Sequence, residues 1–477
     1  MTRRPAAPPT RKVPPRPASR PLPASRPLRP GQKVALTFRA MDPDGSAVGS
    51  AGAYAVAVPF AIPGEEALVE IVRGGRPAEG RIVSLIRKSP LAAAPRCRHF
   101  GICGGCQWQH LTYEAQLEYK TTLVREQLAF ALEPAGVQVA PAIGTTPWEY
   151  RSRLQATFAV RQDRLVAGYH AAAEDLRIIN VRECPIQHGV NVRALGAVRD
   201  VIAGLDWPVY DHASRRGLVR GMIVQTAAAT GEIMVVLSTA AELPDRMAYV
   251  RAMREALTGL ISLVLSIQPR HSPELLGRLN LLWGRAYIEE EIDGLRVRLF
   301  PRASTPPTPR ATVGWLEAIA GALAAGPNDV IMDAACEDGL VPVWLARRTA
   351  RVVGIAPDRE AMHHAWEHAR LNGVENCVFY TRAPARVVAK LRERGGRFDA
   401  AVLTSRRAPA PPELFAGLAD AGAQRLALAG SSLPLLAADL RTAQGAGFHP
   451  RAVQPVDLLP QTSRIHSVVS LVRAQGR

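Results

Sequence analysis

The first patterned part of the sequence shows short segments in which apolar and polar residues alternate. Such alternation occurs at residues 34–38, 54–58, 67–72 and 81–86, and it is typical of strands with one buried face. Turn residues at 42–45 and 63–64 separate these segments. About five short strands between residues 31 and 90 predict a small closed barrel of the OB type, a platform that often binds oligonucleotides.

Helical spacing replaces this alternation further along the chain. Apolar residues recur near a helical period between residues 115 and 132, and again between 245 and 257. Residues 146–300 otherwise mix strands with helices, and residues 296–300 form one of the predicted strands.

A proline-rich break at residues 303–309 precedes the last region, which begins with a predicted helix at 312–323. Alternating strands and helices then predict a mostly parallel, Rossmann-like sheet, with strands at 330–333, 352–355, 377–380, 400–403 and 425–428. The chain is therefore predicted to be a multidomain α/β protein. Its parts are a disordered basic arm (1–30), an OB-like barrel (31–90), a central α+β domain with a cysteine loop (91–300) and a Rossmann-like domain (301–477).

The charge balance adds an expected partner. The 477 residues carry a net charge of +17, and a surplus of this size is typical of proteins that bind nucleic acid. Part of it lies in the arm, but the remainder is spread through the folded body, which favours an anionic partner over a solubility tail. No apolar run of about 18 residues predicts a membrane span, and the proline-dense start resembles neither a secretory signal nor a transit peptide.

Four of the six cysteines fall in a pattern of metal ligands. Cys97, Cys103 and Cys106 form a Cys-x5-Cys-x2-Cys loop that is rich in glycine, and Cys184 is the remaining cysteine before the Rossmann-like domain. Spacing alone leaves an iron–sulfur cluster and a tetrathiolate zinc site equally open, and free buried thiols remain a third reading. Metal ligation by thiolates also predicts a reducing, cytoplasmic setting.

Several segments in this order resemble the iron–sulfur branch of the RNA uracil-C5 methyltransferases. The cysteine loop, Cys184-Pro185 and the segment 456–462 (Val-Asp-Leu-Leu-Pro-Gln-Thr) carry the resemblance, together with 150–153, 282–289 and 372–373. Residues 61–65 (Ala-Ile-Pro-Gly-Glu) resemble the TRAM domain that precedes these enzymes. The resemblance covers residue 31 to the C-terminus. It implies a 4Fe–4S cluster on Cys97, Cys103, Cys106 and Cys184, S-adenosylmethionine (SAM) as the methyl donor, and ribosomal or transfer RNA as the partner.

The family's chemistry depends on residues that this chain replaces. A cysteine thiolate adds to C6 of uracil, C5 takes the methyl group, and a carboxylate base removes the C5 proton. Ser431 stands at the nucleophile position, and His466 stands at the base position. The family's Asp-Pro-Pro-Arg motif has become residues 404–407, in which Thr404 replaces the aspartate and Arg407 keeps the arginine.

The cofactor positions are altered as well. The family reads Asp-x-Tyr-Cys-Gly-x-Gly at the first strand-to-helix turn, where this chain has residues 333–339 with Glu337 in place of the first glycine. Ala356 replaces the acidic residue that holds the ribose, with Asp358 two residues further on. The family positions for SAM fall on Asp333, Ala335, Gly339, Gly354, Ala356 and, in the proline-rich break, Pro306.

These replacements make the sequence's first prediction an RNA-binding pseudo-enzyme that has lost the nucleophilic cysteine and the general base. One alternative is an active SAM-dependent RNA methyltransferase with altered chemistry, for example through Cys336, although a cysteine in that turn is more often a packed apolar residue. Another is an RNA binder that responds to redox state or iron through its cluster. No membrane partner and no preference for DNA are expected, and the sequence carries no signal of the oligomeric state.

Overall fold

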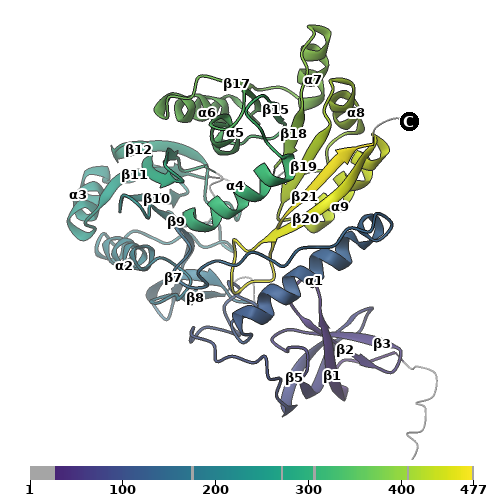
Figure 1. The fold of residues 1–477 in the computed structure, drawn as a ribbon. Helices are drawn as coiled ribbons and strands as arrows, with labels where there is room; N and C mark the ends of the chain where they lie inside the picture. The colour runs from purple at the N-terminus through teal and green to yellow at the C-terminus, as the bar shows by residue number, and fades with distance from the viewer. Residues whose placement is uncertain (1–26, 173–176, 270–271, 304–307, 405–407, 475–477) are drawn as a thin grey trace, which may run out of the picture. The chain divides into compact units, whose positions relative to one another are not determined.

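The computed structural model describes residues 27–172, 177–269, 272–303, 308–404 and 408–474 (Figure 1). The chain divides into two compact units, one made of the barrel up to Lys88 and one that contains residues 41–46 and everything from Ser89 onward. Most of the arm predicted at residues 1–30 lies outside the described residues, as do Pro306 and Arg407.

The barrel unit contains five strands that close on themselves, as the alternating pattern predicts. The strands are β1 (Lys33–Met41), β2 (Ala47–Ala51), β3 (Tyr54–Val58), β4 (Glu66–Arg73) and β5 (Ala78–Arg87), in the order β1-β2-β3-β5-β4. Every second residue of β4 from Ala67 to Ile71 is fully buried, because successive side chains of a strand point to opposite faces. Leu36, Phe38, Val56 and Val58 complete this small core.

The second unit begins with the cysteine loop and the 20-residue helix α1 (Tyr113–Leu132), which Thr112 caps through its side chain. A seven-stranded sheet follows in the order β12-β11-β10-β9-β6-β7-β8. Its members are β6 (Arg153–Arg161), β7 (Arg164–His170), β8 (Ile178–Asn180), β9 (Val219–Thr226), β10 (Ile233–Thr239), β11 (Leu260–Ile267) and β12 (Arg278–Gly284). The core of this sheet includes residues from α2 (Gly189–Gly204) and α3 (Arg246–Ala256).

A short hairpin, β13 (Ile288–Ile292) with β14 (Leu295–Leu299), leads to a second seven-stranded sheet. Its order is β17-β16-β15-β18-β19-β21-β20. The five predicted strands are present as β15 (Val330–Asp333), β16 (Arg351–Ile355), β17 (Cys377–Tyr380), β18 (Ala400–Leu403) and β19 (Arg425–Gly430), and all five are parallel. The sequence did not predict the two antiparallel strands that extend the sheet, β20 (Phe448–Val456) and β21 (His466–Arg473).

Six helices accompany this sheet: α4 (Pro309–Leu323), α5 (Leu340–Ala346), α6 (Arg359–Leu371), α7 (Pro384–Glu393), α8 (Pro412–Asp420) and α9 (Leu433–Gly445). The helix predicted at 312–323 begins three residues earlier, since proline is well suited to a first helical turn. Right-handed crossovers place α5 and α6 on one face and α7 and α8 on the other, and the strand order reverses beside β15. Ligands of such sheets bind outside the carboxyl ends of the strands at this reversal. None of the described helices has the length and apolar character that a membrane span requires.

Candidate functional site

The four cysteines singled out in the sequence lie around one cavity of about 60 Å³ in the second unit. Cys97, Cys103, Cys106 and Cys184 all line it, and all are free thiols. The remaining lining includes His99, Phe100, Gln109, Arg151 and Tyr169. The fold therefore brings Cys184 to the loop although it is distant in sequence, as the sequence predicts.

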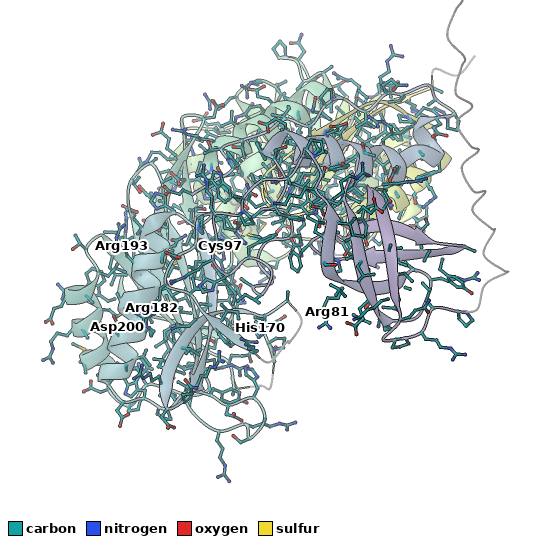
Figure 2. All side chains as sticks on the ribbon, turned by 90° about the horizontal axis from the view of Figure 1, so that it is seen from below. Arg81, Cys97, His170, Arg182, Arg193 and Asp200 are labelled. Atoms are coloured by element: carbon teal, nitrogen blue, oxygen red, sulfur yellow. The ribbon has the colours of Figure 1, made fainter. Side chains whose placement is uncertain are left out.

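Backbone hydrogen bonds hold the cysteine loop against the end of β7. Gly104 donates to His170 O at 3.0 Å, and Cys103 forms an antiparallel bridge with Ala171. Gly101 lies at a φ of 86°, where a side chain would be strained, so this turn requires a glycine. The loop is thus fixed to the central sheet. The exposed Arg182 and Arg193, labelled in Figure 2, lie beside this sheet, Arg182 after the end of β8 and Arg193 on α2.

Burial makes the thiols of Cys103, Cys106 and Cys184 poor acids as long as no cation is near. It raises the pKa of Cys103 and Cys184, and it raises the pKa of Cys106 to about 12. A bound metal reverses this balance, because thiolates are its ligands and the positive charge stabilises them. In the described parts of the chain, no three His, Cys, Asp or Glu side chains converge closely enough to hold a single metal ion.

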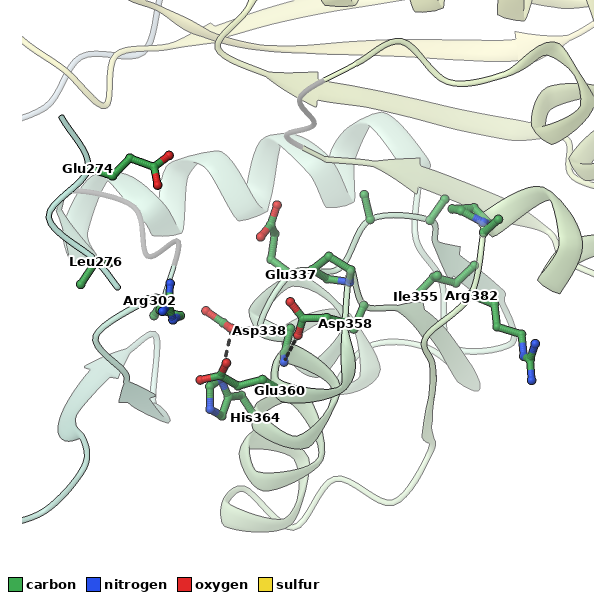
Figure 3. Close-up of a pocket in the computed structure, with 18 of the residues that line it drawn as sticks. Glu274, Leu276, Arg302, Glu337, Asp338, Ile355, Asp358, Glu360, His364 and Arg382 are labelled. Carbon is green, nitrogen blue, oxygen red and sulfur yellow. Dashed lines mark hydrogen bonds and ion pairs between the residues drawn. The ribbon is translucent and has the colours of Figure 1, made fainter. Parts of the chain in front are cut away.

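A larger pocket of about 1,080 Å³ opens at the carboxyl ends of β15 and β16 (Figure 3). Glu274 and Arg302 lie on the central-domain side, opposite Glu337, Asp338 and Asp358 on the strand-end side. Five carboxylates line the pocket (Glu274, Glu337, Asp338, Asp358 and Glu360), against two arginines (Arg302 and Arg382). The pocket therefore carries a strongly negative lining.

The turn after β15 holds the first group of predicted cofactor positions. Asp333 is completely buried, its Oδ1 accepts the Ala335 N–H at 3.0 Å, and its Oδ2 has no hydrogen-bond partner among the described residues. Burial raises the pKa of Asp333 to about 7, and the charge of Glu337 adds to that shift. Glu337 itself lies at a φ of 47°, in the left-handed region that favours the glycine expected there. Gly339 also has a positive φ, of 87°, and a Cβ at this position would lie 2.5 Å from Ala365 Cβ.

The end of β16 holds the second group of predicted cofactor positions. A Cβ on Gly354 would lie 2.7 Å from Phe379, so close packing of β16 on β17 requires the glycine. Ala356 lines the pocket without a polar side-chain atom. Asp358 also lines it, but its Oδ1 caps α6 by accepting the Ala361 N–H at 2.8 Å, which leaves only its other oxygen for a ligand.

Two of the predicted catalytic positions, Thr404 and Ser431, line a third, small cavity of about 60 Å³ at the ends of β18 and β19. Ser432 and Asp439 also line this cavity. Thr404 is buried and its hydroxyl donates to Ala335 O at 2.6 Å, toward the cofactor turn. Asp439 accepts the Ala410 N–H at 2.7 Å. Ser431 is exposed at the start of the turn into α9. Because Thr404 and Ser431 line the same cavity, the fold brings these two positions together.

His466, at the base position, begins β21 opposite Val456. Burial, with the nearby charges of Lys120 and Arg464, lowers its pKa to about 4. Its Nδ1 is buried and has no hydrogen-bond partner among the described residues. His466 is therefore neutral at pH 7, and it is not among the residues that line the cavity of Thr404 and Ser431.

Sequence reasoning missed the contacts that join the cysteine loop to the C-terminal segment 457–462. The backbone N–H groups of Gln107 and Trp108 both donate to Gln461 O at 3.0 Å, and the side chains of Gln116 and Gln461 are hydrogen-bonded at 3.1 Å. A buried ion pair of 2.7 Å joins Lys120 to Asp457. The Pro-Gln-Thr motif is visible in the sequence, but no local pattern indicates the partners of Gln461.

Comparison with known proteins decides the family. The chain is 31% identical over 443 residues to an uncharacterized RNA methyltransferase of Halalkalibacterium halodurans, which covers 92% of this chain and 96% of that protein. The chain belongs to the RNA methyltransferase family. A second uncharacterized RNA methyltransferase, from Caldanaerobacter subterraneus, is 29% identical over 448 residues and covers 93% of this chain and 98% of its own.

Solved structures agree in fold. The crystal structure of the Pyrococcus abyssi tRNA (uracil-54, C5)-methyltransferase in complex with S-adenosyl-L-homocysteine matches 92% of this chain and 100% of its own. Its TM-score is 0.75 at 21% sequence identity, which shows that the fold is shared over nearly the whole length of this methyltransferase-family chain. No family model matches the sequence.

Proposed function

We propose that this member of the RNA methyltransferase family is an RNA-binding protein of the uracil-C5 type that carries a 4Fe–4S cluster and has lost the machinery for methyl transfer. The positions of its cysteines support the proposed loss of methyl transfer. All six cysteines lie within the described residues, and none lines the cavity of Thr404 and Ser431.

The two cysteines outside the loop do not replace the missing nucleophile. Cys336 and Cys377 are buried, at 3% and 2% exposure. Burial raises the pKa of Cys377 to about 12 and that of Cys336 well above its usual value. Addition to uracil C6 needs a thiolate, because a serine hydroxyl is neither readily ionised nor a good leaving group. Ser431 therefore supplies no equivalent chemistry.

The donor set of the cysteine cavity supports a cluster more than zinc. A single zinc ion needs four ligands at about 2.0–2.3 Å from one point, whereas a 4Fe–4S cluster takes each thiolate on a different iron and so fits a wider ring. Four free thiols line one cavity here, so each iron of a cluster would have its own thiolate, and the resemblance of the cysteine loop to the iron–sulfur branch of the family favours the cluster. When bound, the cluster supplies a one-electron redox centre and a covalent tie between the loop and Cys184.

Ribosomal or transfer RNA is the proposed partner, as the family and the net charge of +17 both support. The strand-end pocket argues against tight binding of SAM. The pocket has room at the expected strand ends, but Glu337 occupies a glycine position and Ala356 offers no acceptor for a ribose. Binding of RNA and of an iron–sulfur cluster also supports a cytoplasmic location.

The test uses the full chain, purified without oxygen, with a uridine-containing RNA and isotopically labelled SAM. We expect about four irons per chain, salt-sensitive RNA binding, and no methyl incorporation above that of Ser431→Ala. As a positive control, Ser431→Cys, Thr404→Asp and His466→Glu are combined with Glu337→Gly and Ala356→Glu, which restores the family residues of both the catalytic and the cofactor positions on the same scaffold. Methyl incorporation by the unmodified chain would overturn the proposed loss of catalysis.

A second function, RNA binding that depends on the state of the cluster, is favoured by the hydrogen bonds from Gln107 and Trp108 to Gln461. They run from residues next to Cys106 to the segment that leads into β21, so a disturbed loop disturbs that segment. Equal RNA affinity of the unmodified chain and of an iron-free Cys103→Ser chain would exclude this function.

A further inference from the structure

Gln109 is a buried side chain that lies between two of the four cysteines. It is 3% exposed and lines the cysteine cavity. Its Oε1 accepts the backbone N–H of Cys97 at 3.0 Å, and its side chain is also hydrogen-bonded to the thiol of Cys106. One glutamine therefore contacts both ends of the loop that holds Cys97, Cys103 and Cys106.

The hydrogen bond to the Cys97 N–H fixes which end of the Gln109 amide faces Cys106. A backbone N–H needs an acceptor, and the only acceptor of a glutamine amide is its oxygen. With Oε1 directed at Cys97, the NH₂ group is the part of the amide that is left to face Cys106. The bond to sulfur is then an N–H···S bond with Gln109 as the donor, and the usual ambiguity between the two ends of the amide does not arise.

Gln109 differs from the other donors at this site because it is a side chain. Cys103 receives a backbone hydrogen bond from Gly105, and Cys184 receives backbone hydrogen bonds from Ile186 and Gln187. Such backbone donors stay in place whatever the side chain. The donor at Cys106 is the one that substitution can add or remove.

We propose that Gln109 is a positioning residue of the cysteine centre, which braces Cys97 and Cys106 and sets the reduction potential of the bound cluster through its hydrogen bond to the Cys106 sulfur. This inference rests on the proposed cluster. Reduction adds one negative charge that is shared by the cluster and its thiolates, and a hydrogen-bond donor stabilises that charge. The effect is strong at Cys106 because the donor, Gln109, is buried, so little water competes for this hydrogen bond.

Gln107 provides a matched control on the same loop. It lies two residues before Gln109, and its side chain donates to Gly104 O at 3.1 Å. The control variant Gln107→Met therefore removes a glutamine of the loop without removing a donor to sulfur. Gln109→Met keeps the length of the side chain and removes both of its hydrogen bonds. Gln109→Glu keeps an acceptor for the Cys97 N–H and replaces the donor by an anion.

The experiment is a redox titration of the full-length holoprotein, followed by electron paramagnetic resonance, with iron and sulfide measured on each sample. In Gln109→Met we expect the equilibrium to shift about tenfold toward the oxidised cluster, which is 59 mV for a one-electron couple. Gln109→Glu shifts it further in the same direction, because the carboxylate repels the added charge. Gln107→Met stays at the potential of the unmodified protein.

The outcomes separate the two proposals. If the unmodified chain binds neither iron nor sulfide, the proposed cluster is wrong. An unmodified chain with a cluster whose potential is the same in Gln109→Met overturns the assignment of Gln109 alone. If Gln109→Met retains no iron, Gln109→Glu carries the measurement, and a potential in that variant equal to the unmodified protein's also overturns the assignment.

Discussion

The cysteine cavity and the strand-end pocket lie in the same unit of the chain, but they are lined in opposite ways. Around the four thiols, a glutamine side chain and backbone N–H groups are directed at the sulfur atoms. Around the strand-end pocket, five carboxylates face two arginines, and a glutamate occupies a strained turn position. The first site directs hydrogen-bond donors at sulfur atoms whose pKa burial nevertheless raises, whereas the second accumulates negative charge of its own.

This difference shows that two sites on one fold can differ in their electrostatics. The fold of the Pyrococcus abyssi enzyme is matched over its whole length, which shows that the arrangement of strands and helices is shared. The fold leaves the chemistry of each site to its own side chains, such as those at the ends of β15, β16 and β18. Substitutions at the two sites, and at residues between them, therefore test this difference.

The largest effect is expected from removal of a cysteine of the cavity. Cys184→Ser should lower the iron content from about four atoms per chain to near zero, since serine is a poor ligand for this cluster. Cys377→Ser is the matched control, because Cys377 is a buried thiol on β17 of the other sheet, and its Sγ donates to Pro342 O of α5. Iron and sulfide analysis after anaerobic purification measures both. Equal iron in both variants would break the comparison at its first site.

The next effect concerns the buried ion pair that links α1 to the segment after β20. Lys120 and Asp457 are both at 0% side-chain exposure, and Tyr113 also donates to Asp457 at 3.2 Å. Lys120→Met leaves the Asp457 carboxylate buried without its counter-ion, so local stability should fall by about 3–5 kcal/mol. Hydrogen exchange of the α1 amides measures this loss.

A double variant tests the cause of that loss. Lys120→Met with Asp457→Leu removes both charges and should recover most of the lost protection, because no charge is then left buried alone. Arg392→Met serves as the control. It breaks the exposed ion pair with Asp420, so its effect should stay below about 1 kcal/mol.

A smaller effect is expected from the pH dependence that His466 introduces. Its pKa in the folded protein is about 4, below the ordinary value of 6.5, so the unfolded chain binds more protons between these pH values. The contribution to stability is therefore complete above pH 6.5 and is lost as the pH falls toward 4, by at most about 3 kcal/mol. Thermal unfolding at pH 7 and pH 5 measures it. His466→Gln should show a smaller loss between the two pH values, and an unchanged loss would contradict the assignment.

The sequence predicted those parts of the molecule that depend on local patterns. Alternation predicted the barrel, and apolar strands between helices predicted β15 to β19. Spacing and the resemblance together predicted that Cys184 lies near the cysteine loop. The sequence did not predict contacts between distant segments, because no local pattern pairs Gln116 with Gln461 or Lys120 with Asp457. The two antiparallel strands were missed for the same reason, since their pairing joins residues on either side of a nine-residue connection, 457–465.

The smallest effect is expected at Glu337, which holds a strained turn position in the lining of the strand-end pocket. A non-glycine residue at a φ of 47° is strained by about 1 kcal/mol or more, so Glu337→Gly should stabilise the protein by about 1 kcal/mol despite the entropy that glycine adds to the unfolded chain. Ala324→Gly is the matched control, since Ala324 ends α4 at a φ of 44°, away from the residues that line the pocket.

Both glycine variants should raise the melting temperature to a similar degree, but only Glu337→Gly removes a negative charge from the pocket and opens the turn to a ligand. Calorimetry with SAM then separates strain from ligand exclusion. Tighter SAM binding in Glu337→Gly than in Ala324→Gly would show that the glutamate keeps the pocket closed to the cofactor. Equal and weak binding in both would place the cause in Ala356, the other altered position of the same pocket. Tight binding by the unmodified chain would contradict both explanations, because the acidic turn would then be no obstacle to the cofactor.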